Sequence, residues 1–246
     1  MKPMYFVVLR WWVVTIGSSS AGREVASEVL SDIDASTPLF FLSYARSGRR
    51  DSAAPNADPG ANVLRFFNDL STNVAELISR RTGADPGFID RSIPAGHLWS
   101  RELLTAVGTC QVFVALLSAS YLECDWCARE WDAFSRREVV KMNDDASPHE
   151  AGIVPVIWAP VREETHPPAI RAIERFSPTG LRDPDIAANY EKEGIFGLLQ
   201  MGLNDDYQTV VWKIARRIAE ICYDHRVRPR TFEFAELRNI FGSETP

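Results

Sequence analysis

The chain has 246 residues, which is enough for one large domain or for one domain with extensions. Hydrophobic residues make up 46% of it, so it can bury a sizeable core, and its formal net charge of −6 argues against a nucleic-acid-binding module. Its four cysteines are too few for a disulfide framework at this length, which favours a reducing, cytoplasmic setting.

The first 36 residues form an N-terminal extension whose structure the sequence does not specify. An apolar run from Met4 to Leu9 is interrupted by Arg10 and resumes from Trp11 to Ile16. A transmembrane helix needs about 20 apolar residues, so we expect no stable membrane insertion. The charge inside the run departs from the pattern of a secretory signal. An extra strand, a loosely ordered extension and a wrongly assigned start codon are the alternatives.

Residues 37–225 alternate short apolar runs with segments of helical spacing. The expected strands cover residues 39–42, 88–89, 112–117 and 153–158, with 175–177 as the best candidate for a fifth. The expected helices cover residues 59–81, 99–108 and 207–223, with another following Asp125. This alternation predicts a parallel sheet with helices on both faces. Pro155 favours an edge or bulged strand, and residues 226–246 are expected to form a tail or linker.

The chain is organised around the segment from Val112 to Phe134. Its first six residues are continuously apolar, which predicts a strand covered on both faces, as in a parallel sheet. A short polar loop follows, and Asp125 is a plausible N-cap for the next helix. Trp126 and Glu130 then lie one helical turn apart, just beyond the carboxyl end of a strand. Ligand crevices of open α/β sheets lie in that region.

Three segments resemble, in order, motifs of the TIR domains, the Toll/interleukin-1 receptor–resistance protein family. Phe40–Tyr44 resembles the first strand, Phe88–Asp90 followed by Gly96 resembles the second strand and the BB loop, and Ser118–Glu130 resembles the S-x-x-Y-x-x-S-x-W-C-x-x-E stretch. The resemblance spans roughly residues 37–223 and implies a flavodoxin-like open parallel sheet of about five strands with helices on both faces. The chain also resembles the actinobacterial TIR-like subgroup encoded beside Fxs-type ribosomal peptide maturation genes.

The resemblance implies two kinds of function. Many TIR domains cleave the nicotinamide–ribose bond of NAD+, and some cyclise the ADP-ribose product, with a catalytic glutamate that matches Glu130. Breaking that bond develops oxocarbenium charge on the ribose, which a carboxylate can stabilise. NAD+ is then the substrate, and no cofactor or metal is expected. Other members only associate as signalling adaptors. Long loops after Arg46 and before Tyr207, and Cys124 in place of the family's serine, favour this alternative of a scaffold without activity.

Several side chains are candidates for holding NAD+ beside Glu130. The substrate-binding candidates are Ser43, Tyr44, Arg46, Asp90 and Trp126. Each also has a structural explanation. A glutamate in a first helical turn is favoured by the macrodipole whatever its role. Trp126 can be a core aromatic, Tyr44 can close the end of the sheet, and Arg46 can be a solvated surface residue.

The loop that follows Asp90 is the candidate surface for self-association. It carries Ile93, Pro94 and Gly96, and in the resembled family this loop docks onto a neighbouring domain and controls access to the NAD+ pocket. The expected partners are therefore NAD+, further copies of the chain and other TIR or signalling proteins, with no nucleic acid.

Cys124 and Cys127 form a Cys-x-x-Cys pair at the start of a helix. Such a pair can be a redox centre, because a helix N-terminus stabilises a thiolate. It can also be half of a zinc site, but no second pair completes one. A thioredoxin fold places the motif after an early strand, whereas two strand–helix units precede it here. Cys127 matches the cysteine of the resembled family, which implies that it is a packing residue.

Overall fold

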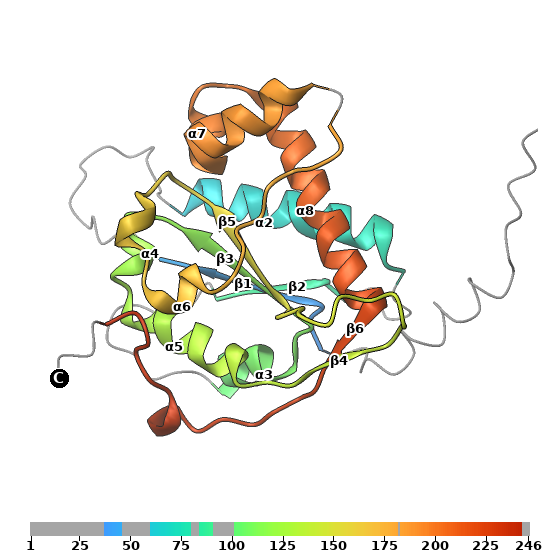
Figure 1. Cartoon of the computed structure of the whole chain (residues 1–246), viewed down its shortest axis with the longest axis vertical. Coiled ribbons are helices and arrows are strands. Elements are labelled where there is room, and N and C mark those ends of the chain that lie inside the picture. Colours follow the sequence, from blue (N-terminus) through green and yellow to red (C-terminus); the bar gives the residue numbers. More distant parts are fainter. Residues whose placement is uncertain (1–36, 46–59, 80–83, 91–100, 182, 243–246) are drawn as a thin grey trace, which may run out of the picture.

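A parallel sheet forms the centre of the computed structural model, which describes residues 37–45, 60–79, 84–90, 101–181 and 183–242. Within these residues the sheet has four strands, β1 (Phe40–Tyr44), β2 (Gly87–Ile89), β3 (Val112–Leu117) and β5 (Ile153–Ile157), in the order β2-β1-β3-β5 (Figure 1). All three strand pairs are parallel. This is the order of a flavodoxin-like fold, so the predicted fold class is confirmed. The expected extension, residues 1–36, lies outside the described part.

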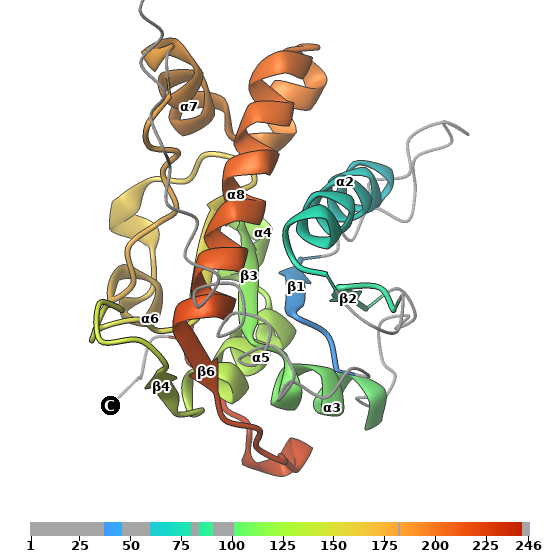
Figure 2. The same ribbon diagram turned by 90° about the vertical axis from the view of Figure 1, so that its right-hand side faces the viewer.

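Helices cover both faces of this sheet. The helices α2 (Ala61–Leu77) and α8 (Asn204–Asp224) lie on one face, with α7 (Pro184–Gln200) against α8, while α3 (Arg101–Thr109) and α5 (Asp125–Ser135) lie on the other (Figures 1 and 2). Successive strand residues point to opposite faces. Phe40 and Leu42 therefore join the core beneath α2 and α8, whereas Phe41 and Phe113 join the core beneath α3 and α5. Coverage on both faces explains why the strand segments are continuously apolar.

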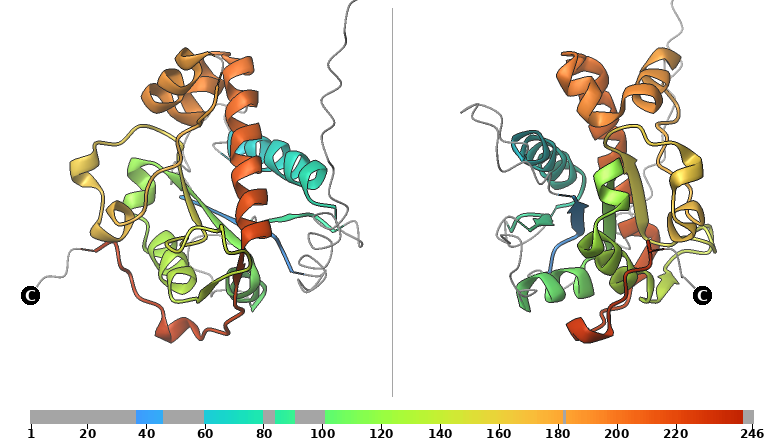
Figure 3. Two further views of the ribbon diagram at one scale, coloured as in Figure 1. Left: turned by 45° about the vertical axis from the view of Figure 1, so that its right-hand side comes forward. Right: turned by 90° about the vertical axis from the view of Figure 1, so that its left-hand side faces the viewer.

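Short elements complete the chain (Figure 3). They are α4 (Ala119–Leu122), β4 (Val139–Lys141), α6 (Pro168–Arg171), β6 (His225–Val227) and single 3-10 turns at Glu163–Thr165 and Phe234–Glu236. β4 and β6 pair antiparallel, which the sequence did not predict. Within the described ranges, no helix combines the length and the apolar character that a membrane crossing requires.

The candidate fifth strand at Arg175–Ser177 is wrong, and the residues of β5 show why. The backbone N–H of Phe176 donates to the Pro155 carbonyl at 2.9 Å, but no ladder follows. Pro155 has no N–H to offer, and the N–H of Ile157 donates to the Tyr190 hydroxyl at 2.9 Å. The outer edge of β5 is thereby closed to another strand. The edge position expected for the strand containing Pro155 is confirmed.

The long loop expected before Tyr207 is largely the helix α7. Asp183 caps it by accepting from the Asp185 N–H at 3.0 Å, and Pro184 occupies the first turn. Gly194 interrupts the helix with φ 65° and ψ 176°. The interruption breaks the apolar periodicity from which a helix is recognised.

Gly194→Ala is expected to destabilise the fold much more than Gly202→Ala. Both glycines have positive φ, but a Cβ on Gly194 would lie 2.7 Å from the Trp158 carbonyl oxygen, whereas a Cβ on Gly202 would meet nothing within 4 Å. Alanine at Gly202 should cost about 1 kcal/mol of strain. At Gly194 the backbone occupies a φ/ψ region that only glycine adopts easily, so alanine there should cost about 1–3 kcal/mol of strain. The steric clash with the Trp158 carbonyl comes in addition. Urea denaturation of the two variants measures the difference, and equal losses would contradict the close approach.

The segment expected to be a C-terminal tail or linker packs against the domain as far as residue 242. We call residues 228–242 the C-terminal strap. The Arg230 N–H donates to the Gly108 carbonyl at the end of α3, and Phe232, Leu237 and Phe241 are buried. Figure 1 shows the strap in red, running past α3 and α5. The face of the sheet that α3 and α5 cover is therefore closed by a third, irregular element.

Candidate functional site

The candidate site lies where β1 and β3 end side by side. The chain leaves β1 toward β2 on one side of the sheet and leaves β3 toward β5 on the other. This reversal of strand order is the position at which open α/β sheets bind ligands. Ser43 is the fourth residue of β1 and, like Phe41, faces α5. A polar side chain is thereby directed toward the helix that carries Glu130.

Glu130 accepts a hydrogen bond from Ser43 across the interior of the domain. The Ser43 Oγ lies 2.5 Å from Glu130 Oε2, and both side chains are buried, with 1% and 8% of their surfaces exposed. Ser43 Oγ also lies 3.0 Å from the Tyr121 hydroxyl. Serine has one hydroxyl hydrogen, which it donates to the Glu130 carboxylate. Ser43 can then only accept from the Tyr121 hydroxyl, so Tyr121 is the donor in that bond. The result is a directed chain from Tyr121 through Ser43 to the carboxylate.

Tyr121 is suited to remain the donor in this chain. Its side chain is completely buried, and burial is the largest cause that raises its pKa well above the usual value. The nearby Cys127 and Glu130 raise the pKa further, and the hydrogen bond with Ser43 opposes them without reversing the shift. The phenol therefore keeps its proton. Tyr121 stands in the S-x-x-Y part of the sequence motif, but no local pattern predicts its contact with Ser43, 78 residues away.

The helix α5 begins one residue earlier than expected, which changes the interpretation of Glu130. Cys124 is the N-cap in place of Asp125, and Asp125 is the acidic residue of the first turn. Glu130 lies beyond that turn, where the macrodipole effect on a side chain has fallen off. Its burial against Ser43 is therefore not explained as helix-end electrostatics. A carboxylate placed in the interior needs such hydrogen bonds to offset its desolvation.

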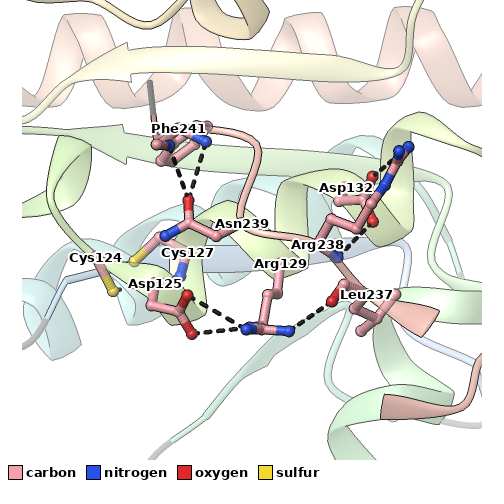
Figure 4. A network of polar contacts seen from close by, with 10 residues as sticks. Cys124, Asp125, Cys127, Arg129, Asp132, Leu237, Arg238, Asn239 and Phe241 are labelled. Atoms are coloured by element: carbon pink, nitrogen blue, oxygen red, sulfur yellow. Dashed lines mark hydrogen bonds and ion pairs between the residues drawn. The ribbon is translucent and has the colours of Figure 1, made fainter. Parts of the chain in front are cut away.

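Trp126 contacts the C-terminal strap. Its ring stacks on Phe234 with centroids 5.7 Å apart and an interplanar angle of 29°. The Arg129 guanidinium lies 5.2 Å from the same Phe234 ring, pairs with Asp125 and donates to the Leu237 carbonyl (Figure 4). These contacts tie the strap to the first two turns of α5. Trp126 thus has an aromatic partner within the chain.

The other candidates are only partly brought together. Tyr44 faces the core beneath α2 and α8, opposite to Ser43, and its hydroxyl donates to the Asp90 carbonyl at 3.2 Å. This bond links the ends of β1 and β2 at the carboxyl edge of the sheet. Arg46, Ile93, Pro94 and Gly96 lie outside the described residues. Among the candidates that the structure describes, two pairs are therefore in contact, Ser43 with Glu130 and Tyr44 with Asp90.

A cavity of about 590 Å³ lies elsewhere, between α8 and the segment 174–180 beside β5. Every basic side chain of its lining has a partner in the chain: Arg175 pairs with Glu163, Arg216 with Glu220 and Arg217 with Glu150, and Lys213 donates to the Gly180 carbonyl. Because the three arginines are paired with carboxylates and Lys213 is bound to a carbonyl, the cavity is a weaker candidate site than the buried carboxylate. In the part of the chain that the structure describes, no three His, Cys, Asp or Glu side chains cluster as metal ligands.

Sheet order and helix placement define this protein as a doubly wound, flavodoxin-like α/β domain. The family model described as TIR domain matches residues 68–192, about half of the chain, so the chain belongs to the TIR domain family. The matched region includes Tyr121 and Glu130 but not β1, which the structure joins to it through pairing with β3. The more specific resemblance to the Fxs-cluster subgroup stays a prediction. Neither the curated proteins nor the solved structures contain a match to the chain.

Proposed function

We propose that this protein is an NAD+ glycohydrolase or cyclase that acts in signalling or defence, with Glu130 as its catalytic carboxylate. TIR domains serve in signalling or defence. The observation that carries the proposal is the hydrogen bond from Ser43 to Glu130 at the carboxyl ends of β1 and β3. A carboxylate buried and oriented at the ligand-binding edge of such a sheet is a candidate catalytic group.

The proposed reaction needs one well-placed negative charge. The nicotinamide of NAD+ leaves as a neutral ring from a pyridinium, so no general acid has to protonate it. The ribose then carries oxocarbenium character, and the Glu130 carboxylate stabilises it or holds the ribose hydroxyls. Ser43 and Tyr121 would act as positioning residues, because their hydroxyl chain fixes which way the carboxylate points. The candidates Tyr44, Arg46, Asp90 and Trp126 would bind the remainder of NAD+.

The alternative is a TIR domain that associates with other TIR domains without cleaving NAD+. One contact favours it, because the Trp126 ring is stacked on Phe234. If this stacking persists when ligands are present, Trp126 loses its proposed role in binding NAD+ and the scaffold is favoured.

Incubation of the purified full-length protein with NAD+, with and without a crowding agent, separates the two functions. Chromatography detects nicotinamide together with ADP-ribose or its cyclic isomer. Equimolar appearance of nicotinamide and one of these products supports the enzyme. No nicotinamide under conditions in which light scattering shows assembly would overturn the enzymatic proposal and favour the scaffold.

Activity is expected to rise faster than linearly with protein concentration if assembly completes the site. TIR domains commonly self-associate, and we propose the loop after Asp90 as the contact surface. A head-to-tail contact builds open filaments unless its rotation closes a ring. Ile93→Asp should abolish the rise, because a charge in the contact opposes association. Met201→Asp is the matched control, since Met201 is 51% exposed at the end of α7. Constant specific activity over the concentration range would eliminate assembly as the switch.

A further inference from the structure

The start of α5 brings two cysteines into direct contact. Cys124 is the N-cap of the helix, and its Sγ accepts a hydrogen bond from the Cys127 backbone N–H at 3.3 Å. Cys124 is partly exposed, whereas Cys127 is buried with 1% of its surface exposed. Both residues stand at the beginning of the helix in Figure 4, beside Asp125. The pair thus has one sulfur that reagents can reach and one that is held inside.

The two sulfurs differ in acidity for identifiable reasons. A side-chain hydrogen bond from Cys127 is the largest cause that lowers the pKa of Cys124 to about 7, and the N–H groups of Cys127 and Trp126 act in the same direction, while burial opposes them. Burial is the largest cause that raises the pKa of Cys127. Thiolates, not thiols, are the nucleophiles. Cys124 is therefore the more reactive of the two sulfurs near neutral pH.

Cys110 shows that a lowered thiol pKa is not shared by every cysteine of the protein. Cys110 is fully buried, its Sγ donates to the Val107 carbonyl, and burial raises its pKa to about 11. Such a cysteine is a packing residue. A zinc site also does not fit Cys124 and Cys127, because a structural site needs four ligands and the described residues hold no cluster of three.

We propose that Cys124 and Cys127 form a peroxide-reactive dithiol, in which Cys124 is the attacking residue and Cys127 the resolving one. The Cys124 sulfur attacks hydrogen peroxide, so an S–O bond forms, the O–O bond breaks and the second oxygen leaves as hydroxide, which becomes water. The resulting sulfenic acid is attacked by the Cys127 sulfur. An S–S bond forms, and the hydroxyl group leaves with the Cys127 proton as a second water. Two thiols and one peroxide thus give one disulfide and two waters.

The helix geometry supports this sequence of steps. An N-cap residue and the residue three positions on lie against each other, as the observed Sγ to N–H bond requires. The position of the motif after two strand–helix units argues against a thioredoxin-like redox pair. Cysteine reactivity, however, is determined by the local hydrogen bonds at the start of the helix and not by the order of the strands. This proposal combines the geometry of the pair with the lowered pKa of Cys124, and it does not depend on NAD+ cleavage.

The first test measures alkylation of the native full-length protein by iodoacetamide between pH 5 and pH 10. Digestion with trypsin and a glutamate-specific protease releases residues 124–129, which separates the pair from Cys110. We expect modification of Cys124 with a midpoint near pH 7 and, at pH 6, a rate roughly 5-fold above that of the urea-unfolded chain. A midpoint near pH 9, or equal rates in the two states, would overturn the proposal.

The second test adds hydrogen peroxide and follows the mass of the same peptide. Loss of two hydrogen atoms, restored by dithiothreitol, is the expected product. Cys127→Ser should instead accumulate a sulfenic acid at Cys124 that dimedone traps, and Cys124→Ser should give neither species. Circular dichroism confirms that each variant is folded, with Cys127→Ala as the replacement if the serine is not tolerated. Direct oxidation of wild-type Cys124 to sulfinic acid without a disulfide would refute the resolving role of Cys127.

Discussion

Glu130→Gln is expected to reduce nicotinamide release by at least about 100-fold, the magnitude typical for loss of a group that stabilises charge in a transition state. Glutamine keeps the shape of the side chain, and its amide oxygen can still accept from Ser43, which lies 2.5 Å from Glu130 in the native protein. Only the negative charge is lost. The melting temperature should therefore change little while turnover falls by this large factor. Chromatographic rates and thermal melts of the same preparation measure both quantities.

Asp132→Asn is the matched control for Glu130→Gln. Asp132 is also a buried acid on α5, with 3% of its surface exposed, but its carboxylate accepts from the Arg238 N–H and pairs with Arg136. Its substitution should cost about 1–3 kcal/mol of stability through weakened charged hydrogen bonds. NAD+ cleavage should persist in that variant at temperatures where it is folded. Turnover that survives in Glu130→Gln would show that another group is essential.

The central strand illustrates what the sequence predicts well. Val112–Leu117 is apolar at every position because the sheet is covered on both faces. An uninterrupted apolar run of this kind therefore predicts burial on both faces from the residue types alone. The edge position of Pro155 follows from its missing N–H in the same direct way. The family motif similarly indicates Glu130 without any structural information.

Other features depend on contacts between distant segments, which local patterns do not encode. The Tyr121–Ser43–Glu130 chain joins β1 to residues about 80 positions later. Cysteine is not among the usual N-cap residues, so the cap at Cys124 had no propensity signal. The C-terminal strap lacks periodicity, because its buried residues are isolated apolar side chains in irregular backbone. Such segments resemble linkers until their packing partners are known.

The strap and α5 meet at Trp131, so truncation of this residue should affect stability strongly. Its side chain is 1% exposed. Its ring lies edge-on to the rings of Phe113 in β3 and Phe241 in the strap, with centroid distances of 6.0 Å and 5.8 Å. The tryptophan therefore joins three elements: the central strand, the helix that carries Glu130 and the strap. Truncation removes a large buried surface and two favourable aromatic contacts.

Trp131→Ala is expected to lower the free energy of unfolding by about 3–5 kcal/mol, a large part of the total of about 5–15 kcal/mol available to a domain. The melting temperature should fall by roughly 10 °C or more. Trp212→Ala is the matched control, because Trp212 is 40% exposed on α8 and its loss should cost less than about 1 kcal/mol. Phe241→Ala should also destabilise, and its effect should be smaller in the Trp131→Ala background, since the two rings touch. Equal unfolding free energies for the two tryptophan variants would contradict the packing of α5 between the sheet and the strap.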